Sequence, residues 1–182
     1  VNMLLTKVLS DGTETKTAHK EVLKKCPFAF ECIEALLSLG VKGNEVQSLI
    51  INGVSEYPCF DWVNQYIRGV SEIYNSRKYQ EAIATLSSID SMKTNPKILA
   101  LIGISYYYSG EYDRSYSYLK KSYDIYPFMK EGIQKYALLC DMFKKTRELE
   151  IILRPSSVSP YHYTSENWFV MATYLYSCLK FE

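Results

Sequence analysis

An internal repeat of about 34 residues constrains the fold of this chain more than any other feature of its sequence. Tyr79 and Tyr112 occupy the same place in two successive units and lie 33 residues apart. The residues around Tyr79, followed by Ala82 and Leu86, repeat the second half of the later unit. A unit of this length buries its apolar face only by stacking on its neighbours. The chain is therefore expected to fold as an array of stacked units.

Apolar residues recur at intervals of three and four, which predicts helices rather than strands. Examples are the set Ile33, Leu36 and Leu37 and the pair Ile133 and Ala137. Only 8 glycines and 6 prolines interrupt the chain, whereas 17 tyrosines are available to pack their rings between helices and keep their hydroxyls near water. These features predict an all-α fold.

The unit from residue 96 to residue 127 shows how one repeat is built. Asn95-Pro96 opens a helix, since proline is tolerated in the first turn. Ser109-Gly110 supplies a tight turn, and Pro127 ends the second helix. The small side chains of Gly103 and Ser115 allow the two antiparallel helices to approach closely. The unit is therefore expected to form a helical hairpin.

This unit resembles the tetratricopeptide repeat, which implies an α-solenoid of stacked antiparallel helical hairpins. The preceding unit matches less well in its first helix, because Gly69-Val70 lies one step from the usual Leu-Gly pair. Trp168 is expected to pack on the hairpin that precedes it. The residues that fill the conserved places of the pattern are Leu99, Ile102, Gly103, Tyr106, Ser115, Leu119 and Pro127. The predicted array covers 1–182, with a partial repeat at 1–29, a degenerate repeat at 30–61, repeats at 62–95 and 96–129, a degenerate repeat at 130–164 and a truncated repeat at 165–182.

Charge and hydropathy argue against nucleic-acid and membrane partners. Lys and Arg number 21 and Asp and Glu number 20, so the net charge of +1 leaves no basic excess for a run of phosphates. The longest apolar stretches hold about eleven residues, fewer than the roughly 20 that cross a bilayer. Residues 1–9 do not read as a signal peptide. Because the chain starts at Val1 without a methionine, we expect a fragment of a longer protein.

Cysteine and histidine usage predicts no metal site and a reducing, intracellular compartment. The five cysteines form no CxxC pair, and no glycosylation sequon is present. The two histidines, His19 and His162, lie too far apart for a zinc site of ordinary spacing. No cofactor is expected either, since phosphate-loop and dinucleotide-binding motifs are absent.

No catalytic residues are predicted. Cys140 and His162 are of the types that serve as nucleophile and base, but the repeats would hold them apart with no third orienting group. Glu148 and Glu150 are paired carboxylates, yet their neighbours Lys144, Lys145 and Arg147 make a solvated, mixed-charge helix face the expected reading. The chain is therefore not expected to be an enzyme.

A protein-interaction surface is expected on the first helices of the hairpins, which line the concave side of such arrays. Three consecutive tyrosines at 106–108 cannot share one helix face, because successive residues are about 100° apart. Tyr106 is assigned to the core, and Tyr107 and Tyr108 point elsewhere. A groove of tyrosines and small polar residues suits an extended peptide or a partner helix. The predicted surface comprises Asn64, Ile67, Ser71, Tyr74, Lys97, Ala100, Ile104, Tyr107 and Tyr108.

A more specific resemblance covers essentially the whole chain. The segment 19–46 resembles the subunit 7 family of the anaphase-promoting complex, and Val41-Lys42-Gly43 favours this family over the other repeat subunits of that complex. Further support comes from Asp61-Trp62-Val63 and Tyr126-Pro127-Phe128. The resemblance implies a non-catalytic scaffold of a mitotic ubiquitin ligase in the nucleus and cytoplasm. Its implied partners are the other subunits of the complex and a second copy of the chain. The alternative is a stand-alone adaptor that binds peptide tails. A carboxylate clamp of that kind needs several Lys, Arg and Asn side chains on the concave face, and Asn64 and Lys97 alone support it only weakly.

Overall fold

The computed structural model describes residues 12–55, 61–156 and 164–179, and all regular structure in these ranges is helical. Within each half of the chain, helices that are neighbours in sequence pack against one another, so the predicted all-α fold of successive helical pairs is confirmed. The residue boundaries of individual repeats stay a prediction. The α-helices are α2 (Gly12–Lys25), α3 (Phe30–Ser38), α4 (Gly43–Ser55), α5 (Asp61–Ser71), α6 (Tyr79–Ser87), α7 (Pro96–Tyr108), α8 (Tyr112–Ile125), α9 (Ile133–Met142), α10 (Thr146–Ser156) and α11 (Ser165–Leu179).

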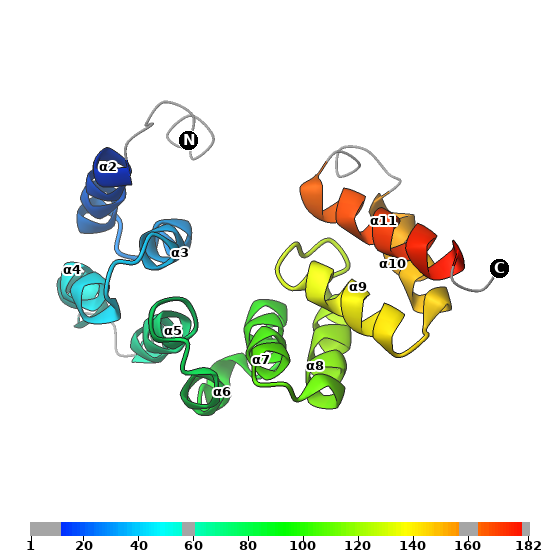
Figure 1. The fold of residues 1–182 in the computed structure, drawn as a ribbon. Coiled ribbons are helices and arrows are strands. Elements are labelled where there is room, and N and C mark those ends of the chain that lie inside the picture. The colour runs from blue at the N-terminus through cyan, green and yellow to red at the C-terminus, as the bar shows by residue number, and fades with distance from the viewer. Residues whose placement is uncertain (1–11, 56–60, 157–163, 180–182) are drawn as a thin grey trace. The chain divides into compact units, whose positions relative to one another are not determined.

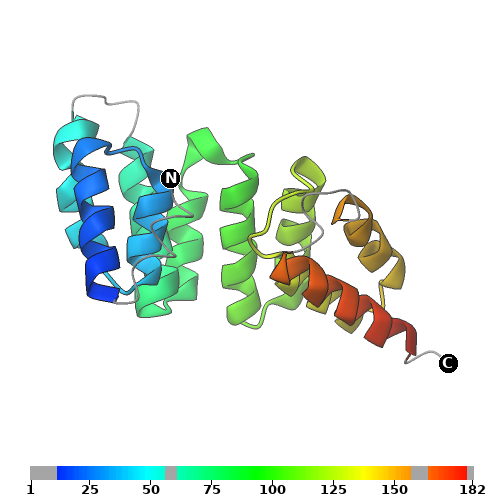
Figure 2. The ribbon, with the colours of Figure 1, turned by 90° about the horizontal axis from the view of Figure 1, so that it is seen from above.

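The chain divides into two compact units, 1–91 and 92–182, each with its own buried side chains. In the first unit, α2 packs on α3 and α4, α4 packs on α5, and α5 packs on α6 (Figure 1). α3 also packs on α5, and Figure 2 shows the helices of this unit running nearly parallel along their lengths. The helices bury the apolar positions that recur every three or four residues. Those fully buried in this unit include Leu23, Ile33, Leu36, Leu37, Val46, Ile50 and Val63.

A π-helical turn, Glu72–Ser76, extends α5 and explains the offset seen in the sequence of this hairpin. Gly69 faces Leu86 just as Gly103 faces Leu119 in the second unit, since a Cβ atom added to either glycine would lie 2.7 Å from the leucine side chain. The two glycines are 34 residues apart, although the tyrosines that follow them, Tyr79 and Tyr112, are 33 apart. The π turn therefore accommodates one extra residue, as single-residue insertions in helices commonly do. Gly69 occupies the same packing position as Gly103.

The second unit begins with the hairpin α7–α8, which forms as its sequence predicts. The Asn95 side chain caps α7 by accepting hydrogen bonds from the backbone N–H groups of Lys97, at 2.9 Å, and Ile98, at 3.4 Å. Gly110 adopts a positive φ of 81° in the turn between the helices. The Ser115 hydroxyl donates to the Gly103 carbonyl at 2.8 Å, which ties the helices together where they approach most closely.

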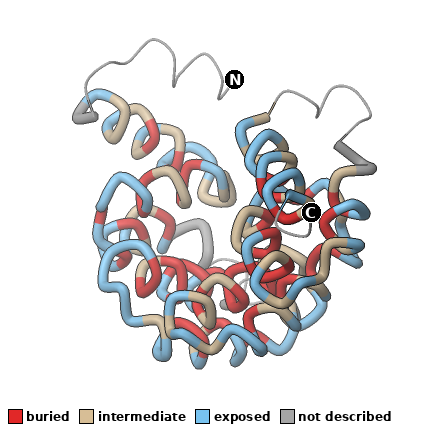
Figure 3. Tube along the Cα trace, turned by 45° about the vertical axis from the view of Figure 1, so that its right-hand side comes forward, coloured by how far each residue is buried: buried red, intermediate tan, exposed pale blue. Residues whose placement is uncertain are grey.

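The remaining helices of the second unit build on this hairpin. α8 packs on α9, α9 packs on α10, and α11 lies against both α9 and α10. In each unit the buried residues lie on the helix faces that are turned toward neighbouring helices (Figure 3). Trp168, which was expected to pack on the preceding hairpin, is 52% exposed, so its ring is not fully buried. Instead, α11 turns Val170, Thr173 and Ser177 inward.

Gly103→Val is expected to lower the free energy of unfolding by about 1–3 kcal/mol, the usual cost of overpacking a close helix contact. A Cβ atom at this position would lie 2.7 Å from Leu119 Cγ and 3.2 Å from its backbone nitrogen, which cannot rotate away. Urea denaturation followed by circular dichroism measures the change. Ala172→Val, on an exposed part of α11, isolates the helix propensity of valine. Equal losses in the two variants would show that the contact tolerates a side chain.

Candidate interaction surfaces

The predicted surface residues of the first unit lie on α5 and the π turn, and they differ in exposure. Asn64 is exposed, and Tyr74 is 49% exposed. Ser71 is partly exposed, and its hydroxyl accepts a hydrogen bond from the Asn75 side chain at 3.2 Å. Ile67 is fully buried, so its assignment to the surface is wrong: the α5 face that carries it is turned into the core.

The predicted surface residues of the second unit lie along α7. Ala100 is fully buried in the core cluster, so it cannot contact a partner and its assignment is wrong. Ile104 and Tyr107 are partly exposed and pack against the same core, although Tyr107 was expected to point away from it. Lys97 Nζ lies 3.8 Å from a Glu131 carboxylate oxygen. Tyr108 is 50% exposed, and its contribution to a binding surface stays a prediction.

Three tyrosines and a lysine gather at the turn of the α7–α8 hairpin, and we call them the tyrosine cluster. The ring of Tyr107 meets the edges of Tyr108 and Tyr112 at centroid distances of 5.7 and 5.6 Å. Lys135 Nζ, on α9, lies 5.9 Å from the Tyr108 ring centroid. Burial and the neighbouring phenols raise the pKa of Tyr107, so its hydroxyl stays protonated and can donate a hydrogen bond. Rigid rings that keep a polar end are the side chains most often found at protein interfaces.

A polar cluster around Glu148 joins α8, α9 and α10 within the core of the second unit. One carboxylate oxygen, Oε2, accepts hydrogen bonds from the hydroxyls of Tyr116, at 2.5 Å, and Tyr136, at 2.9 Å. The other, Oε1, lies 3.3 Å from Lys120 Nζ. Lys145 Nζ lies over the Tyr116 ring, 3.6 Å from the ring centroid. The cluster consists of charge-assisted hydrogen bonds in a partly buried setting, where they are stronger than in open solvent.

The ionisation of these groups follows from their contacts. Burial alone would raise the pKa of Glu148, but the hydrogen bonds from Tyr116, Tyr136 and Lys120 outweigh it and hold that pKa below its usual range. Burial is the main cause that raises the pKa of both Tyr116 and Tyr136. The hydrogen bond to Glu148 comes next for Tyr116, whereas for Tyr136 the nearby Cys140 comes before that hydrogen bond. At neutral pH the carboxylate is therefore charged and both phenols are protonated. This arrangement binds three helices together.

The prediction that Glu148 lies on a solvated helix face is wrong, because its side chain is only 23% exposed. The neighbouring charges in the sequence suggested solvent, but its partners Tyr116 and Tyr136 lie 32 and 12 residues away. No local pattern reveals such a contact. The pair of Cys140 and His162 is not tested, since His162 lies outside the described residues.

Cys140 is expected to resist alkylation while the chain is folded. Burial, together with the nearby Glu148 carboxylate, raises the pKa of the Cys140 thiol to about 12, so almost no thiolate forms at pH 8. Cys26 is exposed and serves as the internal control. Mass mapping after brief iodoacetamide treatment should show modified Cys26 and unmodified Cys140, with both modified in urea. Rapid labelling of Cys140 in the native chain would contradict this burial.

An open cleft in the first unit lies where the N-terminus of α4, the π turn and the N-terminus of α6 meet. Its volume is about 510 Å³, and we call it the polar cleft. Ser71, from the predicted surface, contributes to it. Sequence reasoning missed the rest of the cleft, although the extra residue between Gly69 and Tyr79 was a signal for the π turn. The lining residues are Gly43, Asn44, Gln47, Arg68, Ser71, Glu72, Ser76, Lys78 and Glu81.

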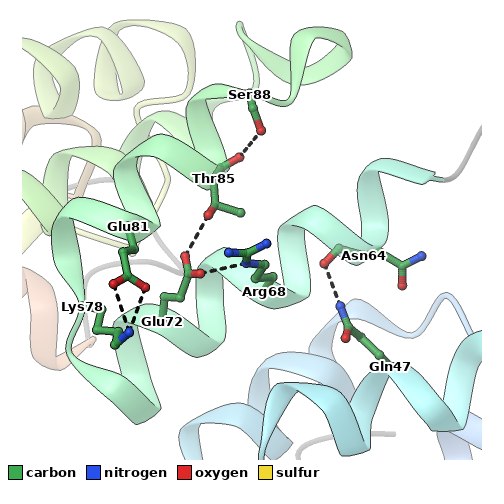
Figure 4. A network of polar contacts seen from close by, with 8 residues as sticks. All are labelled: Gln47, Asn64, Arg68, Glu72, Lys78, Glu81, Thr85 and Ser88. Atoms are coloured by element: carbon green, nitrogen blue, oxygen red, sulfur yellow. Dashed lines mark hydrogen bonds and ion pairs between the residues drawn. The ribbon is translucent and has the colours of Figure 1, made fainter.

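Hydrogen bonds hold the charged walls of the polar cleft in place, as Figure 4 shows. Glu72 is buried and accepts from Arg68 Nε and from the Thr85 hydroxyl, each at 2.9 Å. Lys78 Nζ lies 3.0 Å from both carboxylate oxygens of Glu81. Both carboxylates of the cleft are thus paired with a cation of the same hairpin.

Two further features bear on function. Across the part of the chain that the structure describes, no three His, Cys, Asp or Glu side chains come together in a way that could hold a metal ion. None of the helices found there combines the length and the apolar character needed to cross a membrane.

Comparison with known proteins identifies distant relatives. No protein-family model matches the chain. The chain is 28% identical over 180 aligned residues to anaphase-promoting complex subunit 7 of Homo sapiens, and it is equally similar to subunit 7 of Mus musculus. Each alignment covers 93% of this chain but only 31% of the relative. The chain is thus a distant homologue of subunit 7 and spans about a third of the length of the relatives it matches.

Proposed function

We propose that this chain is a non-catalytic interaction scaffold of an anaphase-promoting complex. The observation that carries the proposal is the similarity to subunit 7 over 93% of the chain, together with an all-α fold of paired helices. The name of the relatives identifies them as subunits of a larger assembly, so other subunits of that complex are the proposed partners. The proposed site of action is inside the cell, in the nucleus and cytoplasm.

The tyrosine cluster is the proposed contact surface of the second unit. Tyr108 and Tyr112 are 50% and 42% exposed, whereas Tyr107 anchors their edges to the core. A partner that covers the cluster would bury the exposed faces of rings whose orientation is already fixed. It would therefore lose little side-chain entropy on binding, which favours affinity. Aromatic residues so placed commonly contribute most of the binding energy of an interface.

Replacing Tyr107 and Tyr108 together by alanine is expected to weaken partner capture about tenfold or more while leaving the helix content nearly unchanged. Capture weakens because the bound partner would no longer bury the two aromatic rings. Quantitative capture and circular dichroism measure the two properties on the same preparations. Tyr126→Ala, which removes another exposed ring of the same unit, is the matched control. Unchanged capture by the double variant would exclude this surface.

A stand-alone peptide adaptor is the second candidate, and the geometry favours it less. A carboxylate clamp needs basic side chains that converge on the peptide terminus, and Lys97 lies 3.8 Å from the Glu131 carboxylate. This ion pair already uses the Lys97 charge that a clamp would need.

Affinity capture with the whole chain as bait, from an extract of dividing human cells, tests the proposal. Mass spectrometry should identify other anaphase-promoting complex subunits, enriched over a bait unfolded by Leu36→Asp. Recovery of unrelated peptide-bearing proteins would instead favour the adaptor. Recovery of no enriched protein by a folded bait would argue against a scaffold role for this chain.

A further inference from the structure

We draw no further inference here: the strongest candidate, the exposed apolar face of α11 that carries Leu175 and Leu179, supports none because nothing in the structure shows what covers it.

Discussion

Replacing Glu148 by alanine is expected to lower the free energy of unfolding by about 1–3 kcal/mol, the usual result of leaving the hydrogen-bond partners of a partly buried charged group unsatisfied. The substitution leaves the hydroxyls of Tyr116 and Tyr136 and the Lys120 ammonium without the carboxylate that they share. These groups come from α8 and α9, so the loss loosens the contact of both helices with α10. Chemical denaturation measures the change. Glu150→Ala, at an exposed position two residues further on, should cost less than about 0.5 kcal/mol.

The stabilisation by Glu148 should also depend on pH in a defined direction. Its hydrogen bonds hold the pKa below the usual value of 4.5 in the folded chain, so folding favours the charged form. The stabilisation is complete above pH 4.5 and is lost as the pH falls through the lower, folded pKa. The difference in stability between the wild-type chain and Glu148→Ala should therefore shrink on acidification below pH 4.5. A difference that grows on acidification would show that the carboxylate is not hydrogen-bonded as described.

Leu36→Ala is expected to cost about 2–5 kcal/mol of unfolding free energy, the range observed for truncating a fully buried leucine. Leu36 has no exposed surface and lies on the inner face of α3. The lost methyl and methylene groups leave a cavity, because the packing of α3 against α2, α4 and α5 limits collapse of the surrounding side chains.

Leu39→Ala is the matched control for this substitution. Leu39 follows α3 and is 36% exposed, so the same change in composition removes much less buried surface. Urea denaturation should therefore show a clearly larger loss for Leu36→Ala than for Leu39→Ala. Similar losses of unfolding free energy in the two variants would mean that α3 does not bury the face that carries Leu36.

The parts of the fold that the sequence predicted correctly depend on local chemistry. Asn95 and Pro96 start α7, Gly110 makes the turn with a positive φ, and Gly103 and Ser115 meet where the helices approach closely. Each of these features requires a particular residue type at a particular place. These helix starts, turns and close contacts can therefore be predicted without knowledge of contacts between distant residues.

Features that depend on distant contacts were not predictable in the same way. Trp168 was expected to pack on the preceding hairpin from its place in the repeat, yet on α11 it is half exposed. Ile67 and Ala100 were placed on a surface from their repeat position, although the helices beside them cover that face. Glu148 was assigned to solvent from the charged residues beside it in the sequence. That assignment failed because its tyrosine partners come from other helices. Burial of a single residue is thus decided by which helices stack on it.

The central claim, that this chain is a scaffold that contacts anaphase-promoting complex subunits, is tested most directly by reconstitution. The purified chain is mixed with human complex prepared without its own subunit 7, and co-migration is measured by density-gradient sedimentation. The account predicts that the chain migrates with the complex and that the Tyr107→Ala, Tyr108→Ala double variant does so much less. Failure of the folded wild-type chain to co-migrate, under conditions in which human subunit 7 rebinds, would contradict it.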